Sequence, residues 1–464
     1  MLPFSASLCH VATRVLAYED PAGRLAGWGL NPRAVALVSD GGPFGRYSYL
    51  AAEPDASAVL AYDDPADGVA MLRAATAFVD PDNHRTDLPP FAGGLVGMAS
   101  FEFGMRLEAM RRRPFRIEGR EAWPELILLR FPAVLAFDHH EKALTAIGRG
   151  ATEAEARAAC DRLTVLWRTT PRLEEKAAFV DGPLRLETPD AVHEDKVAAL
   201  VRQIHAGDLF QANLARGWTG TLRDGVLPGN VMQALHRRGP APFGAMLRLD
   251  DRAIVSNSPE RFIRVDADGL METRPIKGTR PRGGTPEEDA ALAAELLASD
   301  KDRAENLMIV DLMRHDLSKV AEVGSVAVTA LNALESYANV HHLVSTVTAR
   351  LKPGRVVADI LAATLPAGSI SGAPKVQAMK VIGDMEAARG PYCGVLFALD
   401  AGGAMDSSVL IRTLAFERAG ARWHVRAAAG GGIVADSEPE AERIETETKL
   451  SLIKSVLERN QVSD

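Results

Sequence analysis

Short β-prone runs separated by Gly and Pro fill the first 185 residues and predict a fold built on sheets. Runs at 34–38, 46–49 and 126–129 predict strands, and the apolar spacing at 70–78 and 152–167 predicts helices. This part of the chain therefore mixes strands with helices rather than forming a bundle.

The pattern changes after a Pro-containing linker at about 169–190, where strands begin to alternate with longer helices. We expect strands at 209–218, 254–255, 261–265, 270–276, 395–399, 409–416 and 423–429, and helices at 191–205, 286–298, 301–316, 376–388 and 438–459. No internal repeat is visible. The sequence thus divides into an N-terminal region, 1–185, and a second region, 186–464.

The charge balance argues against a protein that binds nucleic acid. Lys and Arg number 53 against 61 Asp and Glu, a formal charge of −8, whereas nucleic-acid binders carry a basic footprint. The most apolar run, 126–137, is interrupted by Arg130 and Pro132 and is too short to cross a bilayer. Residues 1–18 lack a signal-peptide pattern. We therefore expect a cytoplasmic protein with neither nucleic acid nor membrane as partner.

The three cysteines do not form a recognisable framework. Cys9, Cys160 and Cys393 are far apart, and no two of them have metal-ligand spacing. This spacing argues against a disulfide scaffold or a cysteine zinc site, which suits a reducing compartment.

A run of three glycines, Gly430, Gly431 and Gly432, is the first candidate for a binding element. Glycine lets the backbone come close to a ligand and turn its N–H groups toward an anion. A tight hairpin turn explains the same run equally well. No Walker or dinucleotide-binding pattern surrounds it.

A second candidate joins Glu260 and Lys277 across a turn at 266–269. A hairpin closing symmetrically about Ala267 and Asp268 would put Glu260 opposite Pro275 and Lys277 on the face of Glu260. An acid and an amine on one face can serve catalysis. A surface ion pair remains the commoner meaning of such a pair.

Carboxylates on two expected helices form a third candidate. Asp302 and Glu305 are three residues apart and share a helix face. The same spacing puts Glu438, Glu442, Glu445 and Lys449 on one stripe of the last helix. Oxygen ligands from two helices suit Mg²⁺, although a solvated acidic face is the more frequent reason for such a run.

The second region closely resembles the chorismate-utilising enzymes, which include anthranilate synthase component I, aminodeoxychorismate synthase component I, isochorismate synthase and salicylate synthase. The matching segments occur in family order over about 250 residues. They lie at 207–214, 258–262, 274–283, 304–316, 342–345, 366–375, 390–392, 411–413, 430–437 and 442–449. The N-terminal region resembles component I of anthranilate synthase more weakly, at 45–49 and 93–97.

The resemblance implies an α+β fold of two packed, largely antiparallel β-sheets flanked by helices, with chorismate bound beside one Mg²⁺. It implies Glu305 and Glu445 as direct metal ligands, with Glu442 and Asp302 supporting them through water; most family members have Glu where this chain has Asp302. It implies Glu260 as the general acid that assists departure of the C4 hydroxyl. The residues implied for substrate binding are Arg412, Tyr392, Gly430, Gly431, Gly432, Lys449, His342, Gln211 and Thr279.

Two positions sort the subfamilies within this resemblance. Members that add water carry a lysine base where this chain has Gln211, so isochorismate and salicylate synthase activities are disfavoured. Pro-Ile-Lys-Gly-Thr, with Lys277 at its centre, is the signature of the aminodeoxychorismate synthases, whereas anthranilate synthases usually have Ala there. In that subfamily the lysine attacks C2 of chorismate, and ammonia then enters at C4. Burial or nearby cations would have to lower the pKa of such a lysine.

The ammonia source is expected to be a separate glutamine amidotransferase subunit, because none of the three cysteines has the setting of a glutaminase nucleophile. Free ammonia should substitute for it. Anthranilate synthase component I is the alternative activity. Its feedback-regulated members carry Leu-Glu-Ser where this chain has Leu37-Val-Ser-Asp40, which favours the folate pathway. A non-catalytic chorismate-binding relative is a further alternative, which Mg²⁺-dependent turnover would exclude.

Overall fold

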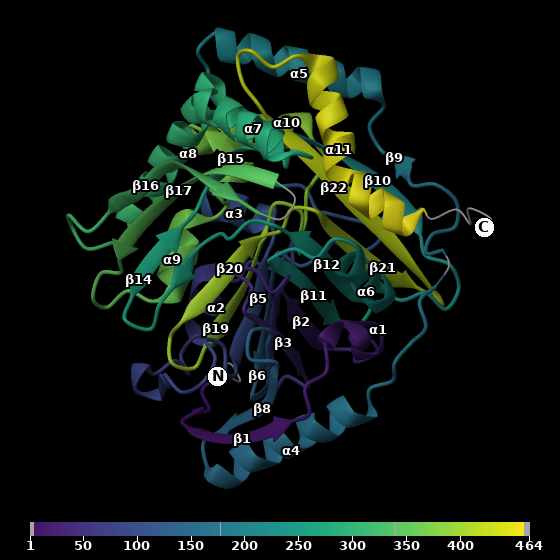
Figure 1. Ribbon diagram of the computed structural model, residues 1–464, viewed down its shortest axis with the longest axis vertical. Coiled ribbons are helices and arrows are strands. Elements are labelled where there is room, and N and C mark those ends of the chain that lie inside the picture. The colour runs from purple at the N-terminus through teal and green to yellow at the C-terminus, as the bar shows by residue number, and fades with distance from the viewer. Residues whose placement is uncertain (1–3, 177, 338–339, 459–464) are drawn as a thin grey trace.

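The chain is seen here as a computed structural model that describes residues 4–458 apart from residues 177, 338 and 339. Its strands form two sheets, and every strand pair in the described part of the chain is antiparallel. Helices cover the outer faces of both sheets (Figure 1). The expected α+β fold is confirmed.

The first sheet combines strands from both ends of the chain. In spatial order it contains β1 (His10–Leu16), β8 (Ala143–Gly150), β7 (Ala133–Asp138), β3 (Tyr47–Ala52), β2 (Ala34–Val38), β11 (Phe243–Leu249), β12 (Arg252–Ser258), β21 (Thr413–Ala419), β22 (Arg422–Ile433), β10 (Gln211–Thr221) and β18 (Gly372–Ala373), with β9 (Arg185–Leu186) beside β10.

The second sheet is mixed in the same way. Its order is β15 (Ile276–Pro281), β17 (Val340–Arg350), β14 (Leu270–Thr273), β13 (Arg264–Val265), β20 (Met405–Val409), β19 (Val395–Asp400), β5 (Gly94–Ala99), β6 (Leu126–Phe131) and β4 (Ala56–Leu60), with β16 (Ala327–Ser336) beside β17. Strands of the two sequence regions are therefore direct neighbours in both sheets.

Apolar side chains fix the order of the layers. One buried cluster joins Val35 and Leu247 of the first sheet to Val96 and Leu396 of the second, so the sheets pack face to face. The α-helices, most of which cover the outer faces, are α1 (Leu25–Trp28), α2 (Gly68–Ala75), α3 (Phe101–Leu107), α4 (Glu153–Thr169), α5 (Asp190–His205), α6 (Pro228–Arg238), α7 (Pro286–Ala298), α8 (Asp300–Ser318), α9 (Val357–Thr364), α10 (Lys375–Met385) and α11 (Pro439–Leu457).

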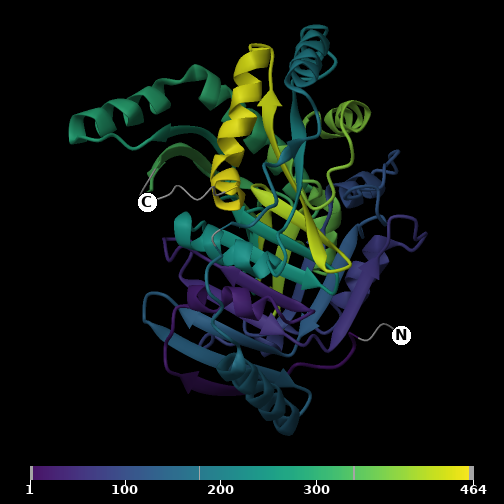
Figure 2. The ribbon, with the colours of Figure 1, turned by 90° about the vertical axis from the view of Figure 1, so that its right-hand side faces the viewer.

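The helices expected at 286–298 and 301–316 are confirmed as α7 and α8. The helix expected at 438–459 is α11, and Arg459 lies outside the described residues. Figure 2 shows α7 extending away from the two sheets, and of its side chains only Leu296 is buried. No helix in the described chain has the length and hydropathy of a membrane span.

Several local expectations are wrong, and one is the strand expected at 270–276, which is divided between β14 and β15. The strand expected at 409–416 is two strands, β20 and β21, because the chain leaves the second sheet and enters the first at residues 410–412. Arg412 takes a positive φ of 50° there, which ends the extended run. The hairpin between β13 and β14 pairs Arg264 with Glu272, one residue away from the expected register.

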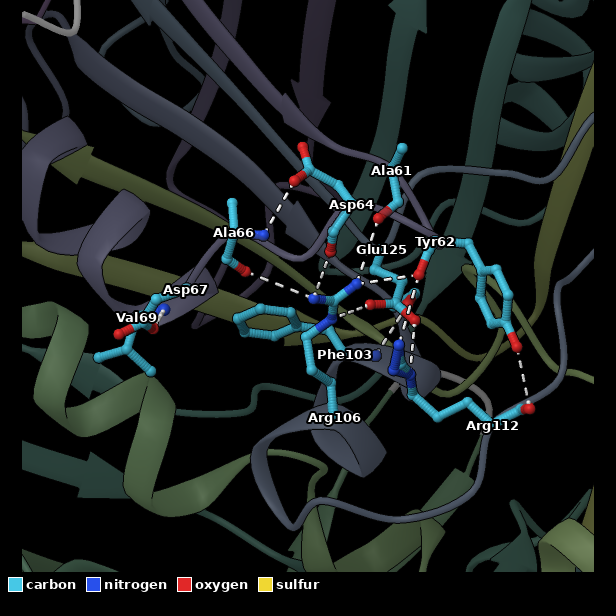
Figure 3. Close-up of polar contacts among 11 residues, drawn as sticks. Ala61, Tyr62, Asp64, Ala66, Asp67, Val69, Phe103, Arg106, Arg112 and Glu125 are labelled. Carbon is cyan, nitrogen blue, oxygen red and sulfur yellow. Dashed lines mark hydrogen bonds and ion pairs between the residues drawn. The ribbon is translucent and has the colours of Figure 1, made fainter.

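A buried acid anchors the short helix α3 on its outer side (Figure 3). Glu125 is 2% exposed and pairs with Arg106 of α3 and with Arg112. Arg106 also donates to the main-chain oxygens of Asp64 and Tyr62, at 2.8 and 3.0 Å. These contacts tie α3 to the loop after β4, since a charge pair inside the protein is kept only with such hydrogen bonds.

Candidate active site

Lys277 projects from an irregular point of β15 beside the helix α8. The pairing of β15 with β17 shifts between Lys277 and Thr279, and Gly278 has φ +79°. A Cβ atom on Gly278 would lie 2.9 Å from Cγ of Asp302, so this position needs glycine for both conformation and space. Nζ of Lys277 then lies 3.8 Å from Oε2 of Glu305. The bulge therefore brings the lysine to Glu305 of α8, whereas Asp302 of the same helix pairs with Arg280 at 3.4 Å.

The three glycines form the end of β22, where they pair with β10. Asn213 is opposite Gly432, and Ala215 is opposite Gly430. The turn alternative for this run is therefore wrong. On its other side β22 pairs with β21 only as far as Ala427. Within the described chain no strand covers that edge beyond Ala427, so main-chain groups of the glycines are available to a ligand.

These glycines lie at the meeting point of three elements. A Cβ atom on Gly432 would lie 2.0 Å from Nε2 of Gln211 and 3.3 Å from Nζ of Lys277. A Cβ atom on Gly431 would lie 2.7 Å from Oε2 of Glu442. The absence of side chains here lets the amine, the amide and the acidic helix α11 approach one strand.

The α11 stripe contributes one buried acid and one ion pair. Oε1 of Glu442 accepts a 2.6 Å hydrogen bond from Ser437, whereas Oε2 is buried and has no partner among the described residues. Burial raises the pKa of Glu442, and the charge of Glu445 adds to this. Glu445 pairs with Lys449, whose Nζ donates to the carbonyl of Gly430 at 2.9 Å. Glu438, the residue before α11, is exposed.

The carboxylates offer hard oxygen donors for a divalent cation, but they are not yet arranged around one point. Among the described residues no three His, Cys, Asp or Glu side chains already converge on one point. Glu305 and Glu445 are held instead by Lys277 and Lys449. The partnerless oxygen of Glu442, buried beside Gly431, is what a bound cation would satisfy. The donor set fits Mg²⁺ in chemistry.

Glu260 lies in the turn between β12 and β13, and its carboxyl group is buried. Oε1 accepts a 2.5 Å hydrogen bond from Ser369. Burial raises the pKa of Glu260, and the charges of Lys277 and Lys449 oppose the rise. Glu260 is not opposite Pro275, because Arg261 bridges to Ser408 and the two strands diverge. Lys277 pairs with Glu305 rather than with Glu260.

His342 and Thr279 form one cross-strand pair of β17 and β15. Oγ1 of Thr279 lies 2.9 Å from Nδ1 of His342. Burial lowers the pKa of His342, and the charge of Arg412 lowers it further, which places Arg412 nearby. Arg412 is exposed and has no side-chain hydrogen-bond or ion-pair partner among the described residues, although the surrounding protein lowers its pKa by desolvation. An uncompensated cation of this kind suits a carboxylate ligand.

Tyr392 is buried after α10, and burial raises the pKa of its hydroxyl well above the usual value. It lines a cavity of about 530 Å³ with Ala215 and Arg389. The structure therefore brings together Lys277, Gln211, Gly432, the acidic residues and Lys449, and it joins His342 to Thr279. Among the residues that the structure describes, no hydrogen bond or ion pair links Tyr392 to that group.

Sequence reasoning missed four residues that contact the site residues or the segments carrying them: Ser369, Asn213, Arg389 and Glu102. Ser369 lies inside the segment 366–375, so its presence near the site had a signal. Arg389 is 3% exposed, and nothing in a sequence distinguishes a buried arginine from an exposed one.

Comparison with known proteins adds a family match and close relatives. A family described as chorismate binding enzyme matches residues 33–455. Aminodeoxychorismate synthase component 1 of Klebsiella aerogenes is 41% identical over 80% of this chain and 78% of its own. Anthranilate synthase component 1 of Thermus thermophilus is 38% identical over 81% and 80%. The solved anthranilate synthase component I from Streptococcus pneumoniae superposes with a TM-score of 0.76 at 28% identity, covering 88% and 92% of the two chains.

Proposed function

The chain belongs to the chorismate-binding enzyme family, and from this premise we propose that it replaces the C4 hydroxyl of chorismate with an amino group. The product is 4-amino-4-deoxychorismate, and the protein is component I of a cytoplasmic, transaminase-type aminodeoxychorismate synthase that serves 4-aminobenzoate and folate biosynthesis. One observation carries the proposal: the amine of Lys277 lies against Gly432, on the strand that would hold the substrate ring.

Cations and main-chain groups would hold the two carboxylates of chorismate. Arg412, whose side chain has no partner among the described residues, and the hydroxyl of Tyr392 bind the enolpyruvyl carboxylate. The uncovered edge of the glycine strand and Lys449 bind the ring carboxylate. Gln211, Thr279 and His342 line the ring between them.

The first chemical step uses the acid and the amine. The neutral amine of Lys277 forms a bond to C2, the ring double bonds shift, and the C4–O bond breaks. Glu260 gives its proton to the departing oxygen, which leaves as water. A carboxyl group whose pKa is raised by burial suits this task because it retains its proton nearer neutral pH.

The second step returns the lysine. Ammonia forms a bond to C4, the double bonds shift back, and the C2–N bond to Lys277 breaks. The nitrogen loses its extra proton to Glu260, which restores the acid for the next turnover. The amine group therefore ends para to the ring carboxylate.

Glu305 and Glu445, with Glu442 and Asp302 behind them, would hold Mg²⁺, which when bound supplies positive charge for the ring carboxylate. A separate glutaminase subunit would provide ammonia. The name of the Klebsiella aerogenes relative, component 1, supports a second component.

Anthranilate synthesis is the second candidate, because the Thermus thermophilus relative is almost as similar as the first. The two activities separate in one experiment, in which the protein is incubated with chorismate, Mg²⁺ and ammonium and the products are identified by mass spectrometry. The proposal expects 4-amino-4-deoxychorismate. Anthranilate with released pyruvate would replace it by the second candidate, and no turnover would refute both.

A further inference from the structure

The segment 386–389 leads to Tyr392 and separates two cavities. Its four residues line both the cavity of about 530 Å³ that Tyr392 lines and another of about 470 Å³ beside α3 and α10. Glu386 and Arg389 are nevertheless buried, and the guanidinium group of Arg389 lies 4.6 Å from the ring centre of Phe101. The polar contacts of these two buried side chains position the segment.

Those contacts centre on Arg389, whose guanidinium group is buried. It donates to both carboxylate oxygens of Glu386, at 2.8 and 2.9 Å. It also donates to the carbonyl of Ile370 at 3.0 Å, and to the carbonyl and side-chain oxygens of Asn213 at 2.9 and 3.2 Å. The planar guanidinium group thus donates hydrogen bonds to three separate segments of the chain at once.

Each of these segments carries a residue of the candidate site. Asn213 is two residues beyond Gln211 on β10. Ile370 follows Ser369, which donates to Glu260. Arg389 itself precedes Tyr392 by three residues. Glu386 closes the arrangement, because its Oε1 also accepts from the amide of Ala215 at 2.7 Å.

The helix α3 supplies a fixed point for this arrangement. Glu102 of α3 is buried, and its two oxygens accept from the amides of Arg389 and Gly390 at 2.7 and 2.8 Å. The amide of Phe101 donates in return to the carbonyl of Gly390. Arg106, one turn further along α3, is held by Glu125 (Figure 3). Through these contacts the N-terminal region is hydrogen-bonded to the segment that leads to Tyr392.

We propose that Arg389, anchored by Glu102, is a positioning residue that fixes Tyr392, Gln211 and the Ser369–Glu260 contact relative to one another. The role rests on the proposed function only in the choice of chorismate as substrate. Arg389 touches no substrate atom in this proposal. It sets the distances between groups that do.

Two variants test the role. Arg389→Lys keeps the charge beside Glu386 and loses the fork that reaches Asn213 and Ile370, so kcat/KM for chorismate should fall by about 100-fold. Glu102→Gln keeps the shape but turns an N–H donor toward a backbone amide, so the KM for chorismate should rise by about tenfold. The KM for ammonium should not change in either. Arg111→Lys, an exposed arginine beside the same segment, is the matched control and should behave as the wild type.

A double-mutant cycle distinguishes positioning from a general loss of folded protein. Tyr392→Phe should cost less in the Glu102→Gln background than in the wild type, because the tyrosine is already displaced. Folded variants with wild-type kcat/KM for chorismate, or fully additive effects in the cycle, would each overturn the proposal. If Arg389→Lys does not fold, Glu102→Gln decides. Wild-type turnover of chorismate reports on the proposed function separately.

Discussion

Nζ of Lys277 lies 3.8 Å from Oε2 of Glu305, so the proposed nucleophile and a proposed metal ligand are paired with each other. Lys449 and Glu445 repeat the arrangement on α11. Each lysine therefore compensates the charge of the acid with which it pairs. Binding of the substrate and the cation would therefore have to break the Lys277–Glu305 and Lys449–Glu445 ion pairs and provide new partners for all four side chains.

Replacing Lys277 by Ala should lower formation of the para amine by about 1,000-fold or more, because it removes the amine that lies against Gly432. Product analysis by mass spectrometry measures the effect, and any anthranilate formed would show that the lysine directs ammonia to C4. Lys352→Ala, at an exposed lysine, is the control. An unchanged rate would mean that Lys277 is not the nucleophile.

Replacing Glu445 by Gln should weaken Mg²⁺ binding by about 10- to 100-fold, since the variant removes one charged oxygen ligand. Calorimetric titration of the protein with Mg²⁺, in the presence of chorismate, measures this without relying on turnover. Glu440→Gln removes an exposed acid from the same helix and should leave the affinity unchanged. Equal affinities in all three proteins would remove Glu445 from the metal site.

Replacing Ser369 by Ala should move the high-pH limb of the rate profile to higher pH. The serine hydroxyl stabilises the ionised form of Glu260 and lowers its pKa, so its loss raises the pKa and the acid keeps its proton longer. The profile of kcat/KM for chorismate, taken at a constant concentration of unprotonated ammonia, tests this. A limb that stays in place would show that another group titrates there.

Glu102 should make folding stability depend on pH between about 4.5 and 7. Burial raises its pKa from 4.5 to about 7, so the folded state binds the proton more tightly than the unfolded state. The stability associated with the protonated acid is therefore lost as the pH rises through this window, by on the order of 3 kcal/mol. Denaturant unfolding of the wild type and of Glu102→Gln at several pH values gives the difference. A constant difference would contradict the raised pKa.

The sequence predicted most residues of the candidate site, whereas it could not give their geometry. Spacing correctly placed Asp302 and Glu305 on one helix, because helical periodicity is local. It gave the wrong register for the β13–β14 hairpin, since a turn lengthened by one residue changes every pair beyond it. Local sequence could not decide between a strand end and a turn for Gly430–Gly432, because both tolerate glycine. The free edge of this part of β22 arises because β21 pairs with β22 only as far as Ala427.

Long-range partners account for the rest. Arg389 meets Asn213 and Ile370, which are 176 and 19 residues away along the chain, and no periodicity links such positions. Arg412 shows the same limit, because a sheet-to-sheet crossing resembles a continuous strand in sequence. The family motifs pointed to these segments without indicating which side chains face inward.

The interleaving of the two sheets also bears on how the chain is made. β5 receives its second neighbour only when β19 exists, since Gly94 pairs with Asp400, about 300 residues later. At the usual pace of synthesis, about 5–20 residues per second, that edge stays unpaired for about 15–60 s on the ribosome. β2 likewise has to wait for β11. Nascent chains of this protein therefore expose open strand edges for most of their translation, the condition under which chaperones and the rate of elongation govern yield.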